Sequence, residues 1–536
     1  MSDRTAVSPV SLQQENHSLV KAAGVIGVAT FSSRILGFIR DMVLARLFGA
    51  TAAADAFYVA FRIPSLLREL FAEGSMSAAF IPVFTEYYSK GSKQEAWELA
   101  SAVFTTLLTI VTLVTLAGIV AAPWLVQLLA PGFQDSPEKL ALTTLLARVM
   151  FPYLLFISLA SVAMGILNSM RAFAVPAYAA LFLNIFIIGC ALFLSPLLEE
   201  PIIGVAVGVV AGGAAQFAMQ LPSLKMRGLL FGFRFEPGHA GVRRIGQLMV
   251  PSLLGMSVTQ VNLTISTILA SFIAGAPAYL FYGMRLIQFP LGIFGVALAM
   301  AILPTLSAQA ARGAMQELRT TLGFGLRMIV FIMLPAMLGL IFLRTPIVHL
   351  FFEHGTFTAH DTAETATAVL CYALGLLAFG GVRIIVAAFY SLQDTRTPAI
   401  SAAVAVTANV IVSLLLMSPL GAAGLALATA IAGMVNGGIL VAVLNRRLGG
   451  VDWASVGRSA RRVVIACIPL TAACLWVAGA QVWTHQGEWA AKSVMLAVGI
   501  GLSVSGYLGV HALMRSEELD LVWGMVRKKL GRVAGG

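Results

Sequence analysis

The chain has 536 residues and a net charge of +11, and 59% of its residues are hydrophobic whereas only 11% are charged. Soluble proteins carry about a quarter charged residues, so this composition excludes a soluble enzyme or a soluble binding module. Apolar runs of about 18 residues or more recur along the whole chain, which predicts an all-α polytopic membrane protein. A membrane β-barrel would instead show short segments of alternating hydrophobicity.

We predict fourteen membrane-spanning helices from these apolar runs. They cover approximately residues 22–49, 55–87, 97–122, 141–168, 174–196, 202–223, 245–274, 278–308, 321–343, 363–391, 398–418, 422–445, 462–481 and 491–514. The first 20 residues lack the apolar core of a signal peptide, so we expect the first span to act as the insertion signal.

The lysines and arginines that lie in loops between these spans occur almost entirely in every second loop. One set of loops holds the basic residues of 225–244 and 515–532, whereas the alternate loops hold only Lys139, Arg344 and Lys492. Because cytoplasmic loops carry the excess of basic residues, this asymmetry predicts that both termini are cytoplasmic. It also explains the net positive charge without a nucleic-acid partner.

Three sequence matches at one offset predict an internal repeat. They pair Phe80–Thr85 with Ile302–Ser307, Pro123 with Pro346, and Ser169 with Ser391, at offsets of 222, 223 and 222 residues. Each half then holds six spans and inserts the same way, a design in which transporters bind substrate between the halves. The predicted organisation is an N-terminal lobe (1–224), a basic cytoplasmic linker (225–244), a C-terminal lobe (245–446), an extra helix pair (447–514) and a basic cytoplasmic tail (515–536).

The first hairpin is the predicted working part of the chain. Residues 33–74 form two apolar segments around a turn at Gly49–Ala54, yet they carry Arg34, Arg40, Asp41, Arg46, Asp55, Arg62, Arg68, Glu69 and Glu73. A charge at mid-bilayer costs about 2.5–3.5 kcal/mol on insertion scales, so we expect most of these side chains to face a watery cavity or the ends of the spans. Arg34 lies about 20 Å along the helix from Lys21, near mid-bilayer.

Several arginines with few acids suit an anionic ligand, because guanidinium binds phosphate oxygens bidentately. Arg34 and Asp41 are seven residues apart and share a helix face, while Arg40 points elsewhere unless the helix bends. The alternative reading is that Arg40 and Asp41 form a structural ion pair. For Arg68 the alternative is pairing with a neighbouring acid such as Glu69.

In the second half, Arg285 lies about 10 Å inside its span, where it either faces the cavity or snorkels to the outer interface. Arg46, Arg62, Arg148 and Arg383 are expected to be anchors or packing partners. Metal binding is not indicated: His349, His354 and His360 lack compact ligand spacing and are predicted to lie in a solvated outer loop. The four cysteines fall inside apolar spans, and no GxSxG, P-loop or HExxH motif indicates an enzyme.

Several segments resemble one known family across nearly the whole chain. They are SRILGFIRD, DAFYVAFRIPSLLRELFAEGSMSAAFIPVF, LAPGF, FPYLLFISLASVAMGILN, YGMRLIQFPLGIFGVALAMAILP and AFYSLQDTRTP. They resemble the lipid II flippases of peptidoglycan synthesis (the MurJ or MviN family), which belong to the multidrug/oligosaccharidyl-lipid/polysaccharide exporter superfamily. The resemblance implies two six-helix lobes in a V around a cationic cavity, and an extra helix pair that forms a groove for a polyprenyl tail.

The resemblance also implies a function and a site. The expected function is transfer of undecaprenyl-diphosphate disaccharide-pentapeptide from the inner to the outer leaflet of the bacterial cytoplasmic membrane by alternating access. By motif, the substrate-binding residues are Arg34, Arg40, Asp41, Asp55, Arg68 and Arg285, with Ser33 and Gln288 as candidate accessory residues. Relatives often carry a glutamate where this chain has Gln288. Some bind sodium through acidic side chains in the second lobe, where this chain offers Asn262 and Asn409.

The expected protein is not an enzyme, uses no cofactor or metal, and is driven by the membrane potential or an ion gradient. Its expected partners are the lipid-linked precursor, membrane lipids and other cell-wall synthesis proteins, and it is expected to be a monomer. The alternatives are an exporter of another polyprenyl-linked glycan or of drugs, and a membrane-embedded glycosyltransferase. A glycosyltransferase would need an outer-facing catalytic site, and the acids of the outer loops show no recognisable spacing.

Overall fold

The computed structural model describes residues 9–71, 75–229, 232–483 and 487–521, together with 523, 524 and 527. Throughout these ranges the regular structure is helical, without strands, which confirms the predicted all-α class. Glu73, Arg4 and most of the basic tail lie outside the described residues. The chain divides into two compact units, Met1–Gln260 and Val261–Gly536, and the division falls inside the predicted span 245–274.

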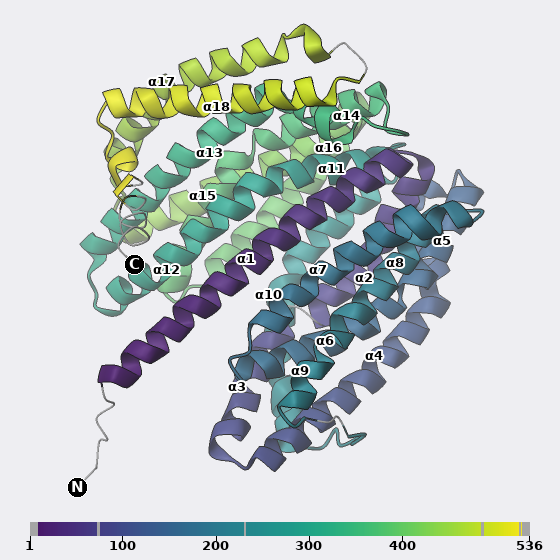
Figure 1. Ribbon diagram of the computed structural model, residues 1–536. Coiled ribbons are helices and arrows are strands. Elements are labelled where there is room, and N and C mark those ends of the chain that lie inside the picture. Colours follow the sequence, from purple (N-terminus) through teal and green to yellow (C-terminus); the bar gives the residue numbers. More distant parts are fainter. Residues whose placement is uncertain are drawn as a thin grey trace. The chain divides into compact units, whose positions relative to one another are not determined.

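The first unit contains the helices drawn in purple to teal in Figure 1. They are α1 (Pro9–Phe48), α2 (Ala52–Phe71), α3 (Ser75–Lys90), α4 (Lys93–Leu129), η1 (Pro131–Phe133), α5 (Pro137–Met150), α6 (Pro152–Ser169), α7 (Ala174–Gly189), η2 (Cys190–Leu194), η3 (Ser195–Leu197), α8 (Ile202–Ala218), α9 (Leu221–Met226) and most of α10 (Ala240–Ala270).

The second unit contains α11 (Ala276–Pro290), η4 (Leu291–Gly295), α12 (Val296–Ala311), α13 (Met315–Phe352), α14 (Ala359–Ala373), α15 (Leu376–Ser391), α16 (Arg396–Leu448), α17 (Trp453–Ala478), η5 (Gln481–Trp483) and α18 (Trp489–Leu513). The pair α17 and α18 lies along α13 in Figure 1. These two helices follow the predicted repeat and are the extra pair expected from the sequence.

Each of the fourteen predicted spans overlaps a helical segment, but the number of spans is not confirmed. Within the described part of the chain, nine helical segments are long and apolar enough to cross a membrane, or ten if the bent pair α14–α15 is one span. Two predicted spans, 398–418 and 422–445, lie in the single element α16, which is broken at Gly421 by a positive φ of 55°. The glycine is needed there because other residues rarely adopt this conformation.

The second span of the second predicted half is interrupted by a π-helical turn. α11 ends at Pro290, and Leu291–Gly295 separates it from α12. In the first unit α2 ends at Phe71 and α3 begins at Ser75, and residues 72–74 between them lie outside the described residues.

Each unit has its own apolar core. In the first unit, Phe80, Phe84 and Leu99 pack against Val162 and Ile166. In the second, the core between α13 and the pair α17–α18 is formed by residues that include Met328, Phe331, Val463, Leu470 and Tyr507. The extra pair is thus attached to the second unit by the same kind of packing that holds the repeat helices together.

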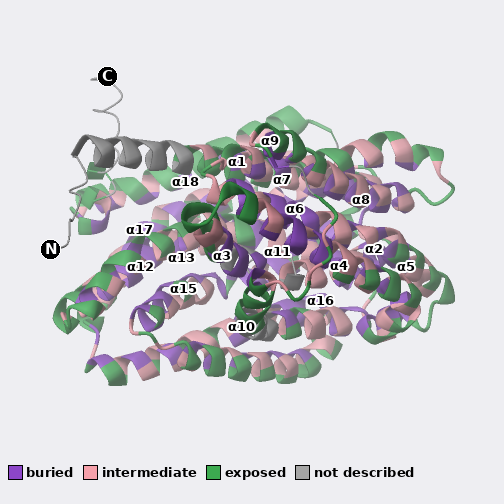
Figure 2. Ribbon diagram, turned by 90° about the horizontal axis from the view of Figure 1, so that it is seen from below, coloured by how far each residue is buried: buried purple, intermediate pink, exposed green. Residues whose placement is uncertain are grey.

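The outer helix faces are apolar as well. Buried and exposed stripes alternate along the helices in Figure 2, and the exposed stripe of α4 carries Leu113, Val120, Trp124 and Leu128. A soluble protein would avoid exposing so many large apolar side chains on one helix. These faces fit a lipid environment, which needs no polar partner from the protein.

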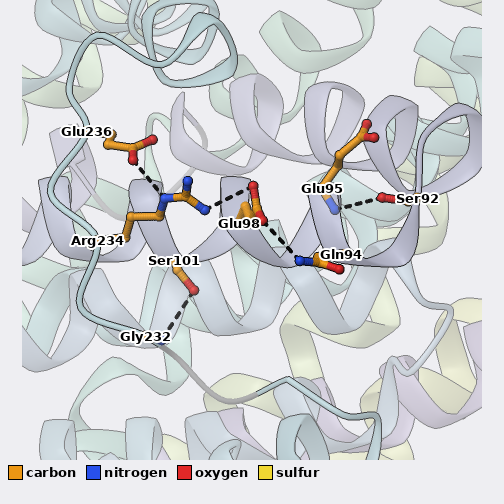
Figure 3. Close-up of polar contacts among 8 residues, drawn as sticks. All are labelled: Ser92, Gln94, Glu95, Glu98, Ser101, Gly232, Arg234 and Glu236. Atoms are coloured by element: carbon orange, nitrogen blue, oxygen red, sulfur yellow. Dashed lines mark hydrogen bonds and ion pairs between the residues drawn. The ribbon is translucent and has the colours of Figure 1, made fainter.

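The segment that follows residue 231 is bound to α4 through its backbone. The Gly232 N–H donates to Ser101 Oγ at 3.3 Å, as drawn in Figure 3, and the Arg234 N–H donates to Thr105 Oγ1 at 3.1 Å. Both acceptors lie on the same side of α4, one turn apart. The predicted linker 225–244 is therefore not a free loop here, because residues 232–234 are attached to the first unit.

The side chain of Arg234 adds two ion pairs to this attachment (Figure 3). Its guanidinium lies 2.9 Å from Glu98 and 2.8 Å from Glu236. The hydrogen bond to Glu236, together with the charge of Glu98, raises the pKa of Arg234 above its ordinary value. All three side chains are partly exposed, and exposed ion pairs contribute little to stability. The backbone bonds to Ser101 and Thr105 are therefore expected to dominate.

Hydrogen exchange can test whether the backbone bonds to Ser101 and Thr105 hold the linker more strongly than the Arg234 ion pairs do. The double variant Ser101→Ala/Thr105→Val should speed exchange of the Gly232 and Arg234 amides by roughly fivefold, because it removes both acceptors. Arg234→Ala should have a smaller effect on the Gly232 amide. Thr109→Val is the control, since the Thr109 hydroxyl bonds the Thr105 carbonyl of its own helix. A larger effect from Arg234→Ala than from the double variant would contradict the ranking.

Candidate functional site

The hairpin of α1 and α2 carries most of the predicted site residues. α1 ends at Phe48, and Gly49 follows with a positive φ of 58°, which lets the chain reverse tightly. α2 begins at Ala52, within the turn predicted at Gly49–Ala54. The two helices thus enclose the turn as expected and place Arg34, Arg40 and Asp41 on the first arm.

Arg40 and Asp41 form an ion pair, contrary to the expectation that Arg40 points elsewhere on a straight helix. Arg40 Nε and Nη2 donate to Asp41 Oδ1 at 3.0 and 2.7 Å, and Asp41 is fully buried. Helical spacing places the two Cβ atoms about 100° apart, but the long arginine side chain spans that separation. The pairing alternative considered from the sequence is therefore confirmed. Ligand binding by Arg40 stays a prediction.

A residue that the sequence analysis passed over completes this cluster. Asn184 on α7 accepts a hydrogen bond from Arg40 Nη1 at 3.0 Å, and its Nδ2 lies 3.4 Å from the Ser33 carbonyl on α1. Asn184 is 6% exposed. The sequence could have pointed to this residue only through the presence of an asparagine within an apolar run, because a buried amide requires hydrogen-bond partners.

Arg34 has a different environment from Arg40. Its side chain is exposed, and it forms no ion pair with any side chain in the described ranges. Asp41, which shares its helix face by spacing, is fully buried and bonded to Arg40. Arg34 therefore differs from Arg40 in having no acidic side-chain partner among the described residues, and its role in ligand binding stays a prediction.

Asp55 is paired with a lysine that the sequence analysis assigned to an outer loop. Lys139 Nζ on α5 lies 2.8 Å from Asp55 Oδ2 on α2, and Asp55 is 1% exposed. The same ammonium lies 4.0 Å from the centre of the Phe133 ring, a cation–π contact. This ion pair joins α2 to α5, so Asp55 has a structural partner in addition to its predicted ligand role.

Farther along α2 lies Arg62, which was expected from the sequence to be an anchor or packing partner. Its Nε and Nη2 atoms are buried and find no hydrogen-bond acceptor among the described residues. Glu69 on the same helix accepts a hydrogen bond from Gln260 Nε2. Leaving guanidinium nitrogens buried without an acceptor is costly, which makes Arg62 a stronger candidate than its sequence context suggested.

In the second unit, Arg285 and Gln288 lie one turn apart on α11. The Arg285 guanidinium carbon is 5.3 Å from the centre of the Phe281 ring, so it stacks on the preceding turn. Arg285 is half-buried and Gln288 is exposed. Guanidinium groups that stack on an aromatic ring keep their N–H edge available to acceptors.

One polar cluster of the second unit contains the two asparagines that stand where some relatives bind sodium. Asn409 Nδ2 donates to Asn262 Oδ1 at 2.8 Å and lies 3.4 Å from Ser266 Oγ, so the two asparagines named from the sequence do meet. Their amides bond each other. No cluster of three or more metal-binding side chains occurs in the described ranges.

The prediction of a solvated histidine loop is wrong for His349. This residue lies in the last turn of α13, with Nδ1 2.8 Å from Glu353 and Nε2 2.8 Å from Lys492 Nζ on α18. Lys492 is 4% exposed. α13 continues to Phe352, past the predicted span 321–343, and so brings His349 to the buried Lys492. The spacing of the histidines gave no sign of this partner.

Comparison with known proteins identifies the family that this arrangement resembles. The family model described as lipid II flippase MurJ matches residues 44–498. The probable lipid II flippase MurJ of Vibrio cholerae serotype O1 is 37% identical over 518 residues, covering 94% of this chain and 97% of that protein. The lipid II flippase MurJ of Burkholderia cenocepacia is 35% identical over 475 residues, covering 87% and 92%.

Solved structures agree with the sequence matches. A structure of lipid II flippase MurJ in an inward closed conformation aligns with a TM-score of 0.75 and 27% identity, covering 92% of this chain and 99% of that chain. An inward-facing multidrug resistance transporter of the MATE family aligns with a TM-score of 0.65 and 15% identity, covering 78% and 94%. The second likeness concerns the fold alone.

The ion pair between Asp55 and Lys139 generates a stability prediction. Asp55→Asn or Lys139→Met alone should lower the free energy of unfolding by about 3–5 kcal/mol, because each leaves a buried charge without its partner. The double variant Asp55→Asn/Lys139→Met should recover much of that loss. Thermal unfolding of the purified protein in detergent measures both effects. A double variant as unstable as Asp55→Asn alone would contradict the pairing.

Proposed function

Because the chain belongs to the MurJ family of lipid II flippases, we propose that it moves the lipid-linked peptidoglycan precursor across the cytoplasmic membrane. The substrate is undecaprenyl-diphosphate disaccharide-pentapeptide, carried from the inner to the outer leaflet. The observation that supports this most directly is Arg34, an exposed and uncompensated cation within an apolar helix. A charge kept in such a place at a cost of several kcal/mol is expected to serve a ligand.

The diphosphate is the part of the substrate that these cations would bind. Arg34, Arg40 and Arg68 in the first unit and Arg285 in the second each offer a planar guanidinium, which matches phosphate oxygens bidentately. Each of them contacts the diphosphate at some stage of the transport cycle. Asp41 and Asp55 limit the positive charge of the first hairpin through their own pairs with Arg40 and Lys139.

Transport proceeds by alternating access, with both termini in the cytoplasm and the protein working as a monomer without a cofactor. The repeat of six-span halves is the design that places a substrate site near the middle of the membrane. Export of cationic drugs is disfavoured, since the first hairpin presents arginine where such a drug would need an acid.

A depletion experiment tests the function itself. Removing the protein from growing cells should trap the precursor in the inner leaflet, as measured by a leaflet-specific assay of the lipid-linked disaccharide-pentapeptide. Restored expression should return the precursor to the outer leaflet. Normal outer-leaflet precursor in depleted cells would contradict the proposal, and so would rescue by a drug exporter of the same fold.

The proposed role of the arginines leads to a mutational prediction. The variants Arg34→Ala, Arg40→Ala, Arg68→Ala and Arg285→Ala should each abolish complementation while still inserting into the membrane. Lysine should restore growth at some positions only, because it lacks the bidentate fork. Arg312→Ala is the control, since Arg312 is exposed and pairs with the exposed Glu317. Normal growth of any two alanine variants at native expression would rule out a shared anion-binding role.

The membrane potential is the proposed driving force. The arginines make the empty transporter more positive than the loaded one, so the potential acts on the two forms differently. One elementary charge crossing the field is worth about 2.3 kcal/mol per 100 mV, and an inside-negative potential favours return of the empty form. Collapsing the potential with valinomycin and potassium at a constant pH gradient should slow the appearance of outer-leaflet precursor. An unchanged rate that sodium removal abolishes would overturn this proposal.

A further inference from the structure

We propose that Asn184 is a positioning residue for substrate binding, which orients the Arg40 guanidinium toward the diphosphate. This inference rests on the proposed function and adds to it a residue that no motif indicated. Three hydrogen bonds carry it, two from Arg40 to Asp41 and one from Arg40 to Asn184.

The two bonds to Asp41 do not by themselves fix the guanidinium. Both Nε and Nη2 donate to the same oxygen, Asp41 Oδ1, so that oxygen acts as a pivot about which the group can turn. Asn184 Oδ1 accepts from Nη1 at 3.0 Å and comes from a different helix, α7. A second acceptor at a second point removes the remaining rotation.

The geometry leaves part of Arg40 for a ligand. A guanidinium has five N–H groups, and these three bonds engage three of them. One N–H on Nη1 and one on Nη2 remain for a ligand, and guanidinium N–H groups bind phosphate oxygens bidentately. Arginine loses less entropy per bond when its fork is already held in place, so fixing these groups favours binding.

An amide suits this position better than the alternatives. Its Oδ1 accepts from Arg40 while its Nδ2 lies within reach of the Ser33 carbonyl, so both ends of the amide are used. An aspartate would keep the acceptor but would place a second carboxylate on Arg40, giving the cluster a net negative charge. A leucine would fill similar space without an acceptor.

The test measures binding of undecaprenyl diphosphate and undecaprenyl phosphate to the purified full-length protein in nanodiscs. Asn184→Leu should weaken binding of the diphosphate roughly tenfold, the worth of about one hydrogen bond to a charged group. It should also lower the preference for diphosphate over monophosphate, because the Arg40 guanidinium is then no longer held in place for bidentate binding. Asn184→Asp should weaken binding of the diphosphate as well, because the added carboxylate repels the phosphates, although the hydrogen bond to Arg40 is kept.

Two comparisons separate positioning from a structural role. In an Arg40→Ala background, Asn184→Leu should cause no further loss of binding, since its effect passes through that guanidinium. Asn436→Leu is the matched control: it removes a half-buried amide that accepts from Ser401 Oγ at 2.6 Å, and it should change thermal stability without changing the preference between the two lipids.

The outcomes also separate this inference from the proposed function. Asn184→Leu that lowers thermal stability but keeps the preference between the lipids would overturn the positioning role. An equal loss in the Arg40→Ala background would overturn it too. If the wild-type protein binds neither undecaprenyl lipid nor the complete precursor, the proposed function fails instead, whatever Asn184 does.

Discussion

The constraint on which the first unit depends is that a charged side chain inside an apolar helix needs a partner. Asp41 is fully buried and accepts two bonds from Arg40, and Asp55 is nearly buried and meets Lys139 at 2.8 Å. Removing one member of such a pair costs far more than the pair contributes, because the other charge stays buried. The pair of Asp55 with Lys139 therefore holds α5 to the hairpin by electrostatics as well as by packing, whereas the pair of Arg40 with Asp41 lies within α1.

This constraint also decides which cations are available for a ligand. Arg40 and Lys139 have acids that neutralise them, whereas Arg34 is exposed and has no ion pair with a described side chain. The charge felt by an approaching anion is thus smaller than a count of arginines suggests. It is also more localised, because neutral pairs contribute little field beyond their own length. A transporter that must release its substrate gains from a site of moderate charge.

The linker between the two predicted halves is held to α4 by local hydrogen bonds. Gly232 and Arg234 donate their backbone N–H groups to hydroxyls of α4, and the ion pairs of Arg234 lie over the same helix. Part of the basic charge of this predicted cytoplasmic linker is thus paired within the protein, at Arg234. A loop of the second unit is likewise held by local bonds. Hydrogen bonds from Thr397 hold the pKa of the Asp394 carboxyl below its ordinary range, and Arg447 lies beside it.

The sequence by itself determined the helical class, the approximate positions of the apolar segments and the family, because each follows from composition, periodicity or local motif. The hairpin turn at Gly49 and the arginines of α1 and α2 were found in the same way. The partners of the charged side chains were decided only by the tertiary structure. Asn184, Lys139 and Lys492 lie 84 to 144 residues from the groups that they contact, and no local pattern specifies such distances. The packing of α1 on α7 and of α2 on α5 brings those side chains together, and the cost of an unpaired buried charge then selects which of them bond.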